Sequence, residues 1–330
     1  MNAIETKGLV KKFGDFAAVA GINLEIKEGE LFGLLGPNGA GKTTTISMLS
    51  TILKPSSGSA SVWGKDLLHD KDSVRKSIGI VFQDPSLDDE LTGRENLDFH
   101  GRMYAMEPGL IHERIAEVLK LVELESKADA LVKTYSGGMK RRLEIARGLM
   151  HKPKILFLDE PTIGLDPQTR RNLWEYIRNF NKKDGITIIL TTHYMEEADF
   201  LCDRIAIIDH GKIIALDTPE KLKEVLGGDI ITVESTDSNA LKKLLEGQVF
   251  VKETKLFDEH LNVSVDNGGK ALPKLIELAQ KNKITVDSAV LKRPSLEDVF
   301  IHYTGRTIRE EEASDKDKAR MQVKVGGFRR

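Results

Sequence analysis

GPNGAGKTT, at Gly36–Thr44, follows a short apolar run and precedes a stretch with helical spacing. It fits the pattern G-x-x-x-x-G-K-[ST] of phosphate-binding loops. Glycines allow a tight turn whose backbone N–H groups point at phosphate oxygens, and the N-terminus of the following helix favours anions. The alternative is a glycine turn that binds no ligand, but such a turn would not require a strand before it and a helix after it. The segment predicts a triphosphate site built from Gly36, Pro37, Asn38, Gly39, Ala40, Gly41, Lys42, Thr43 and Thr44.

Hydrolytic chemistry is predicted where this loop meets a second motif, ILFLDEP at Ile155–Pro161. Lys42 supplies a positive charge for the β- and γ-phosphates, and the Thr43 hydroxyl is a hard oxygen ligand for Mg²⁺. Asp159, at the end of the apolar run, is expected to hold the same metal ion. Glu160 follows directly and suits a general base that polarises the attacking water. An acidic pair at a strand end is often only solvated, but the presence of the loop at Gly36 favours the catalytic interpretation.

The first 219 residues alternate apolar, β-branched runs with amphipathic stretches, which predicts an α/β fold with a largely parallel sheet. No strand pattern appears between Pro85 and Lys152, so we expect a helical subdomain at about residues 86–152. The expected strands and helices of this domain are Leu31–Leu35, Thr43–Leu53, Ile78–Phe82, Glu95–Tyr104, Leu110–Leu124, Gly138–Met150, Ile155–Leu158, Ile186–Thr191 and Arg204–Ile208.

A second, smaller α+β domain is predicted over residues 220–305. Its pattern runs β-α-β-β-α-β, the order of a ferredoxin-like sandwich, and then reaches a last helix at Ser295–Tyr303, with Ser295 as its N-cap. The charge-dense residues 306–330 predict a disordered tail. The strands are expected at Ile230–Glu234, Val249–Lys255, Leu261–Val265 and Ile284–Leu291, with helices at Ala240–Glu246 and Lys270–Gln280.

Composition argues against nucleic-acid-binding, disulfide-bonded and membrane-spanning proteins. The chain has 330 residues, with 49 Lys and Arg against 51 Asp and Glu, so its charge gives no reason to expect a nucleic-acid partner. The single cysteine, Cys202, excludes an internal disulfide and fits a buried core position. We expect no signal peptide and no membrane-spanning segment, because the apolar runs are strand-sized whereas a spanning helix needs about 20 residues.

YSGGM at Tyr135–Met139 narrows the interpretation. Ser136, Gly137 and Gly138 open a predicted helix and offer a hydroxyl and bare backbone N–H groups to an anion. The segment resembles the signature of ATP-binding cassette (ABC) ATPases, although Tyr135 and Met139 replace the first and last residues of the family's LSGGQ. The order of loop, signature and LDEP is far more specific than any one of them. The resemblance implies MgATP as the bound nucleotide and a P-loop NTPase domain of the ABC type.

The resemblance assigns four further residues. Gln83 matches the glutamine that senses Mg²⁺ and the attacking water and links to a membrane partner, and His193 matches the histidine on the γ-phosphate. Asp166, in GLDP, matches an aspartate that crosses the dimer interface. Phe13 stands where the family stacks an aromatic ring on adenine, although a core-facing Phe is the simpler alternative.

The C-terminal region, with RPSLEDVFIHYTGR at Arg293–Arg306, resembles the extension of daunorubicin-resistance-type ATPases. That resemblance implies a homodimer working at the cytoplasmic face of the membrane with a separate permease that exports a drug, lipid or other hydrophobic compound. It also implies that Ser136 and Gly138 of one copy complete the ATP site of the other. A soluble, non-transport ABC ATPase, acting in assembly or regulation, is the alternative.

The basic run Lys140, Arg141 and Arg142 follows the signature segment. It is interpreted as the solvated face of the helix, with Leu143 and Ala146 turned inward.

Overall fold

The computed structural model describes residues 1–84, 86–257, 260–292 and 294–305. Two compact units divide the described residues: unit 1, residues 1–217, and unit 2, residues 218–305. The disorder predicted for residues 306–330 falls outside the described residues.

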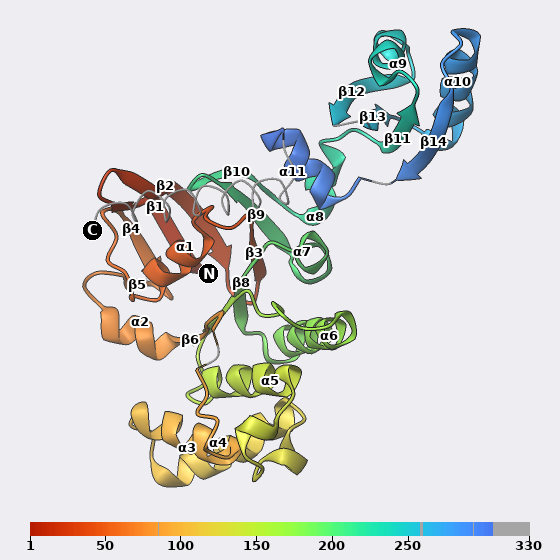
Figure 1. The fold of residues 1–330 in the computed structure, drawn as a ribbon. Coiled ribbons are helices and arrows are strands. Elements are labelled where there is room, and N and C mark those ends of the chain that lie inside the picture. Colours follow the sequence, from red (N-terminus) through yellow and green to blue (C-terminus); the bar gives the residue numbers. More distant parts are fainter. Residues whose placement is uncertain (85, 258–259, 293, 306–330) are drawn as a thin grey trace, which may run out of the picture. The chain divides into compact units, whose positions relative to one another are not determined.

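A six-stranded sheet forms the centre of unit 1, in the order β10-β9-β3-β8-β7-β6 (Figure 1). Its strands are β3 (Leu31–Leu35), β6 (Ile78–Val81), β7 (Ile155–Asp159), β8 (Thr187–Thr192), β9 (Arg204–Asp209) and β10 (Lys212–Asp217). All neighbours pair in parallel except β9 and β10. The predicted largely parallel sheet is therefore confirmed, and β3 and β7 are buried at every position, as strands covered on both faces are.

A second sheet was not among the predicted elements. It is antiparallel, in the order β2-β1-β4-β5, and consists of β1 (Asn2–Phe13), β2 (Phe16–Lys27), β4 (Ser57–Val62) and β5 (Lys65–Asp66). Its inward residues, such as Ile4 and Ile22, share one hydrophobic core with Met48 and with Phe157 of the parallel sheet. This core fixes the helix α1 (Lys42–Leu49), and with it the loop before α1, against both sheets.

Helices surround the parallel sheet and extend beyond its β6 edge (Figure 1). The group beyond β6 is the predicted helical subdomain, and its helix α5 packs on β6 and α6. Thr92 and Glu95 form a capping box at the start of α3, which explains where that helix begins. The helices of unit 1 other than α1 are α2 (Lys71–Ser77), α3 (Gly93–Met103), α4 (Pro108–Leu121), α5 (Gly137–Gly148), α6 (Pro167–Asp184) and α7 (Met195–Leu201).

A partly buried histidine, His100, lies on α3. The ring of His100 lies 4.9 Å from that of Tyr104 and 6.2 Å from that of His151. Its Nε2 is buried without a hydrogen-bond partner among the described residues. Burial, with further contributions from the charges of Arg147 and His151, lowers the pKa of His100 to about 4.

His100 should make the protein less stable in mild acid. The unfolded chain takes up a proton near the ordinary pKa of 6.5, whereas folded His100 does so only near 4. The unfolded state therefore binds more protons between these values. The free energy of unfolding should fall by up to roughly 2 kcal/mol between pH 7 and pH 5 on account of this group.

In His100→Phe, the decrease in Tm from pH 7 to pH 5 should be smaller than in the wild type. Exposed His112, changed to Gln, is the control and should keep the full decrease; equal decreases in all three proteins would refute the assignment.

Unit 2 is an α+β sandwich with its own core. The strands β11 (Asp229–Ser235), β12 (Val251–Phe257), β13 (His260–Val265) and β14 (Val286–Lys292) form an antiparallel sheet in the order β12-β13-β11-β14. Ile231, Val233 and Leu261 pack against Leu241 and Leu275 of the helices α9 and α10. Ser295 caps α11 in a capping box with Asp298, as expected from the sequence. The helices are α8 (Pro219–Glu224), α9 (Ser238–Leu245), α10 (Gly268–Lys281) and α11 (Leu296–Thr304).

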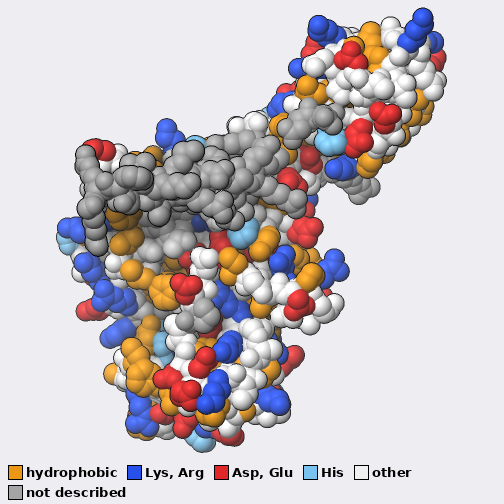
Figure 2. All heavy atoms as spheres, viewed as in Figure 1, with side chains coloured by type: hydrophobic (Ala, Val, Ile, Leu, Met, Phe, Trp, Pro, Cys, Tyr) orange, Lys and Arg blue, Asp and Glu red, His pale blue; other side chains and the backbone are white. Residues whose placement is uncertain are grey.

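On the face shown in Figure 2, Lys and Arg side chains are interspersed with Asp and Glu side chains over the helical part of unit 1. That part of the face carries no surface of a single charge sign. Among the described residues, no helix combines the length and the apolar character that crossing a bilayer requires.

Candidate functional site

The glycine loop connects β3 to α1, as its sequence predicts. Glycine is required at two positions. A Cβ at Gly36 would lie 2.2 Å from the carbonyl oxygen of Ile208. Gly41 has φ 104°, and a Cβ there would lie 2.4 Å from the carbonyl oxygen of Ala18. The loop can therefore lie close to the backbone of β9 and β2 only with glycine at these positions.

Three charged or ionisable side chains meet beside the loop. Lys42 donates from Nζ to the carbonyl oxygens of Gly36 and Pro37, at 2.8 and 3.0 Å. Its Nζ also lies 3.4 Å from Oε1 of Glu160, and both side chains are buried. Nδ1 of His193 lies 3.1 Å from the other Glu160 oxygen, although the direction of this contact is not that of a well-formed hydrogen bond. The structure thus brings together three predicted site residues: Lys42 at the start of α1, Glu160 directly after β7 and His193 directly after β8.

Opposing effects act on the Glu160 carboxyl. Burial raises its pKa, but the contact with His193 and the charge of Lys42 outweigh burial, so the pKa lies below its ordinary value. Glu160 is therefore ionised at neutral pH and available to accept a proton.

Two hard oxygen atoms lie next to this cluster. The Thr43 hydroxyl donates to Oδ1 of Asp159 at 3.1 Å. Thr191 also donates its hydroxyl to Asp159 and accepts a hydrogen bond from the backbone N–H of Glu160 at 3.0 Å. A hydroxyl and a carboxylate are the ligand types that Mg²⁺ prefers, so the residues present fit that ion. Sequence reasoning did not predict Thr191, which orients both acidic residues.

The signature segment lies on another element. Ser136 is the N-cap of α5, and its Oγ accepts a hydrogen bond from the backbone N–H of Met139 at 3.2 Å. Ser136 and Gly137 are exposed, which leaves them accessible to a second molecule.

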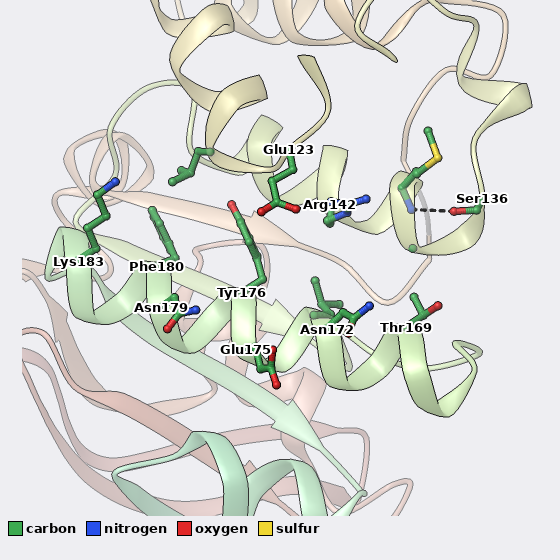
Figure 3. Close-up of a pocket in the computed structure, with 14 residues that line it drawn as sticks. Glu123, Ser136, Arg142, Thr169, Asn172, Glu175, Tyr176, Asn179, Phe180 and Lys183 are labelled. Atoms are coloured by element: carbon green, nitrogen blue, oxygen red, sulfur yellow. Dashed lines mark hydrogen bonds and ion pairs between the residues drawn. The ribbon is translucent and has the colours of Figure 1, made fainter. Parts of the chain in front are cut away.

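A groove of about 570 Å³ runs from Ser136 between α5 and α6. In Figure 3, Ser136 lies at one end of this groove and Lys183 at the other, with Arg142 and Tyr176 between them. Neither Lys42 nor Glu160 lines the groove, so the phosphate loop and this groove are separate features of unit 1.

Asp166, Gln83 and Phe13 also lie outside the Lys42–Glu160 cluster. Asp166 is the N-cap of α6 and accepts from the backbone N–H groups of Gln168 and Thr169. Gln83 is exposed just after β6. Phe13 ends β1, half-exposed, with Nζ of Lys11 5.1 Å from its ring centroid. The roles that the sequence assigns to these residues stay predictions.

The prediction that Arg141 lies on a solvated helix face is wrong. Arg141 is 7% exposed, and its guanidinium donates to the Glu144 carboxylate and to backbone carbonyl oxygens at the ends of β6 and β7. Its guanidinium is stable there because carbonyl and carboxylate acceptors surround it. Arg142, in contrast, lies at the groove between α5 and α6.

Comparisons with known families cover both units. Residues 19–163 match the family described as ABC transporter. Residues 218–304 match the family described as ATP-binding protein DrrA1-3-like, C-terminal domain.

Curated relatives match along nearly the full chain. The linearmycin resistance ATP-binding protein LnrL of Bacillus subtilis is 41% identical over 314 residues, covering 93% of this chain and 100% of its own. The daunorubicin/doxorubicin resistance ATP-binding protein DrrA of Streptomyces peucetius is 41% identical over 324 residues, covering 96% and 98%. A Nod factor export ATP-binding protein I of Burkholderia lata is 40% identical over 309 residues, covering 93% and 98%.

Solved structures match about two thirds of the chain. CbiO1 of Clostridium perfringens, part of the ABC transporter complex cbiONQ, is 33% identical with a TM-score of 0.63, covering 68% of this chain and 93% of its own. A dimeric ATP-binding cassette in a post-hydrolysis state, bound to ADP and Pi, is 32% identical with a TM-score of 0.58, covering 65% and 98%.

Proposed function

Because this chain belongs to the ABC transporter family of ATP-binding proteins, we propose that two copies pair head to tail and hydrolyse MgATP at sites shared between them. As a member of the family it binds ATP and hydrolyses it to ADP and phosphate, and this hydrolysis powers transport. The observation that carries the proposal is the convergence of Lys42, Glu160 and His193 beside a glycine loop.

The phosphates bind to the loop Gly36–Thr44, with Lys42 reaching the β- and γ-phosphates. Thr43 and Asp159, whose Oγ1 and Oδ1 atoms lie 3.1 Å apart, would hold Mg²⁺ together with Gln83 from the neighbouring loop. When bound, the ion neutralises negative charge on the phosphates. Phe13 stacks on the adenine ring; its exposure at the end of β1 leaves the ring available.

Glu160 acts as the general base on the attacking water, and His193 holds the γ-phosphate and the Glu160 carboxylate in place. The lowered pKa of Glu160 supports this role, because only the carboxylate form accepts a proton.

The partner copy completes the site through Ser136, Gly137 and Gly138, with Asp166 crossing the interface. The exposure of Ser136 and Gly137 supports this arrangement, since the start of α5 offers N–H groups to an anion.

The transport partner is a separate integral-membrane permease, and the subunit works peripherally at the cytoplasmic face of the membrane. On α3, Phe99 and Met103 lie one turn apart and are 61% and 68% exposed, an apolar surface suited to a protein partner. The names of the relatives, which are resistance and export proteins, support export of a drug, lipid or other hydrophobic compound. They offer no support for a non-transport ATPase.

Mixing two inactive variants tests the shared site. Lys42→Ala should lack phosphate binding, and Ser136→Glu should place a carboxylate against the partner's γ-phosphate. Each alone should be inactive. A 1:1 mixture should recover roughly a quarter of the wild-type ATPase rate, because half of the dimers are mixed and each of these has one complete site of two. A mixture as inactive as its components would contradict head-to-tail pairing, and activity of Ser136→Glu alone would remove Ser136 from the site.

A further inference from the structure

The buried guanidinium of Arg141, on α5, uses its full set of donors. Nε donates to the carbonyl oxygen of Pro161 at 2.8 Å. Nη2 donates to the carbonyl oxygens of Asp159 and Glu160, at 2.9 and 3.3 Å. Nη1 donates to the carbonyl oxygen of Phe82 at 2.6 Å and to the Glu144 carboxylate at 2.9 Å. A guanidinium has five N–H groups, and here they make five hydrogen bonds. Through them, one side chain of α5 connects the end of β6 to the end of β7.

Glu144 extends these contacts from the next turn of α5. It is 1% exposed, so its charge depends on the adjacent Arg141 for compensation. Its other oxygen accepts a hydrogen bond from the backbone N–H of Ser86 at 2.9 Å. Phe82 and Ser86 lie on either side of Gln83 along the chain. The pair Arg141–Glu144, the α5 clamp, therefore holds the chain both before and after this residue.

The backbone of Glu160 needs such support. Its φ is +45°, in the left-handed region that a residue with a side chain rarely adopts. A residue keeps such a conformation only when its surroundings impose it. Thr191 holds the N–H of Glu160 through its carbonyl and hydroxyl oxygens, and Arg141 holds the carbonyl oxygen. The two contacts fix both ends of the residue that carries the catalytic carboxylate.

We propose that the α5 clamp is a positioning device for hydrolysis, in which Arg141 and Glu144 hold the Glu160 backbone and the chain around Gln83 in the reactive arrangement. This proposal rests on the proposed function, in which Glu160 is the base. It goes further because neither clamp residue belongs to the glycine loop or to the Ser136–Gly138 segment that the proposed function assigns to ATP. Arg141 follows Ser136 by five residues, so the clamp also connects the start of α5 to the position of the catalytic carboxylate.

Arg141→Lys tests the clamp in the full-length protein. Lys keeps the charge but has one nitrogen with three N–H groups, so it cannot reach all the acceptors that the planar guanidinium holds. Because a displacement of about 1 Å can cost about 10²-fold in rate, kcat for ATP hydrolysis should fall by roughly 10- to 100-fold. The KM and the Kd for ATP should stay within about threefold, because Lys42 and the glycine loop are untouched.

A second arginine, whose side chain is 11% exposed, supplies the matched control. Arg114, on α4, donates from Nε to the carbonyl oxygen of Met150 and from Nη2 to that of Leu149, just after α5. Arg114→Lys should lower the Tm and leave kcat per folded molecule unchanged. If Arg141→Lys shows the same kcat as Arg114→Lys, or if its affinity for ATP falls in parallel with kcat, the clamp only stabilises the fold and the proposal fails.

Glu144→Gln keeps the proposal testable if Arg141→Lys does not fold. Its amide oxygen can still accept from Ser86, but the charge that compensates Arg141 is lost, so kcat should fall with the KM unchanged. An unchanged kcat would overturn the proposal. Glu160→Gln, measured in parallel, separates the two hypotheses: turnover by Glu160→Gln refutes the proposed base, whereas an inactive Glu160→Gln beside a fully active Arg141→Lys refutes the clamp alone.

Discussion

Glu160→Gln should abolish ATP turnover while ATP still binds. The amide has nearly the same shape as the carboxylate but does not accept the proton of the attacking water, and loss of a general base costs about 10²- to 10⁴-fold in rate. The phosphate contacts of Lys42 and the glycine loop are separate from this step, so the Kd should change little. Because hydrolysis is what separates the two copies in the proposed cycle, the variant should also accumulate as a dimer in the presence of MgATP.

Single-turnover hydrolysis and size-exclusion chromatography with ATP measure the two effects. Glu113→Gln, an exposed change on α4, should keep the wild-type rate and the wild-type mixture of monomer and dimer. Wild-type turnover by Glu160→Gln would mean that another group activates the water. A variant that is inactive but stays monomeric with MgATP would keep Glu160 as the base and refute the nucleotide-held dimer.

Lys42→Ala should lose ATP binding itself. Lys42 is 4% exposed and lies between two loop carbonyl oxygens and the Glu160 carboxylate. With ATP bound, its charge is available to the phosphates, and charge-assisted hydrogen bonds of this kind are worth about 1.5–3 kcal/mol each. Losing two of them raises the Kd by at least about 10²-fold.

Equilibrium titration with labelled ATP measures this loss. Lys65→Ala, at an exposed position of β5, is the control and should bind as the wild type does. The Tm should be recorded as well, because Lys42→Ala removes a positive charge that lies 3.4 Å from the buried Glu160 carboxylate. Unchanged binding by a folded Lys42→Ala would exclude Lys42 from the phosphate site.

The parallel sheet was predictable because its strands are largely apolar runs of four to six residues. Leu31–Leu35 matches β3, and Ile155–Leu158 falls within β7. The β1–β2 hairpin was not predicted. Its strands have 12 residues each with burial that alternates irregularly, and the register between them shifts at several points. Bulges interrupt the alternation of buried and exposed residues by which a strand is recognised in a sequence.

Within the site, sequence reasoning succeeded where the chemistry lies in one short segment. The loop Gly36–Thr44 and the Asp159–Glu160 pair are contiguous, and their residue types indicate phosphate and metal chemistry. Arg141 and Thr191 act through contacts with residues 18 to 59 positions away, which no local pattern reveals. One signal was present: Glu144 follows Arg141 by three residues, which is the spacing of an ion pair on one helix face.

The only cysteine of the chain is well hidden. Cys202 is buried, and burial raises the pKa of its thiol well above the ordinary value. A Cβ added at Gly33 would lie 2.7 Å from its Sγ, which shows how tightly the thiol is packed. A maleimide reacts with an accessible thiolate, so the native sequence already serves as a silent background for fluorophores or spin labels. A cysteine introduced on the surface can then report the approach of two copies without removal of any natural thiol.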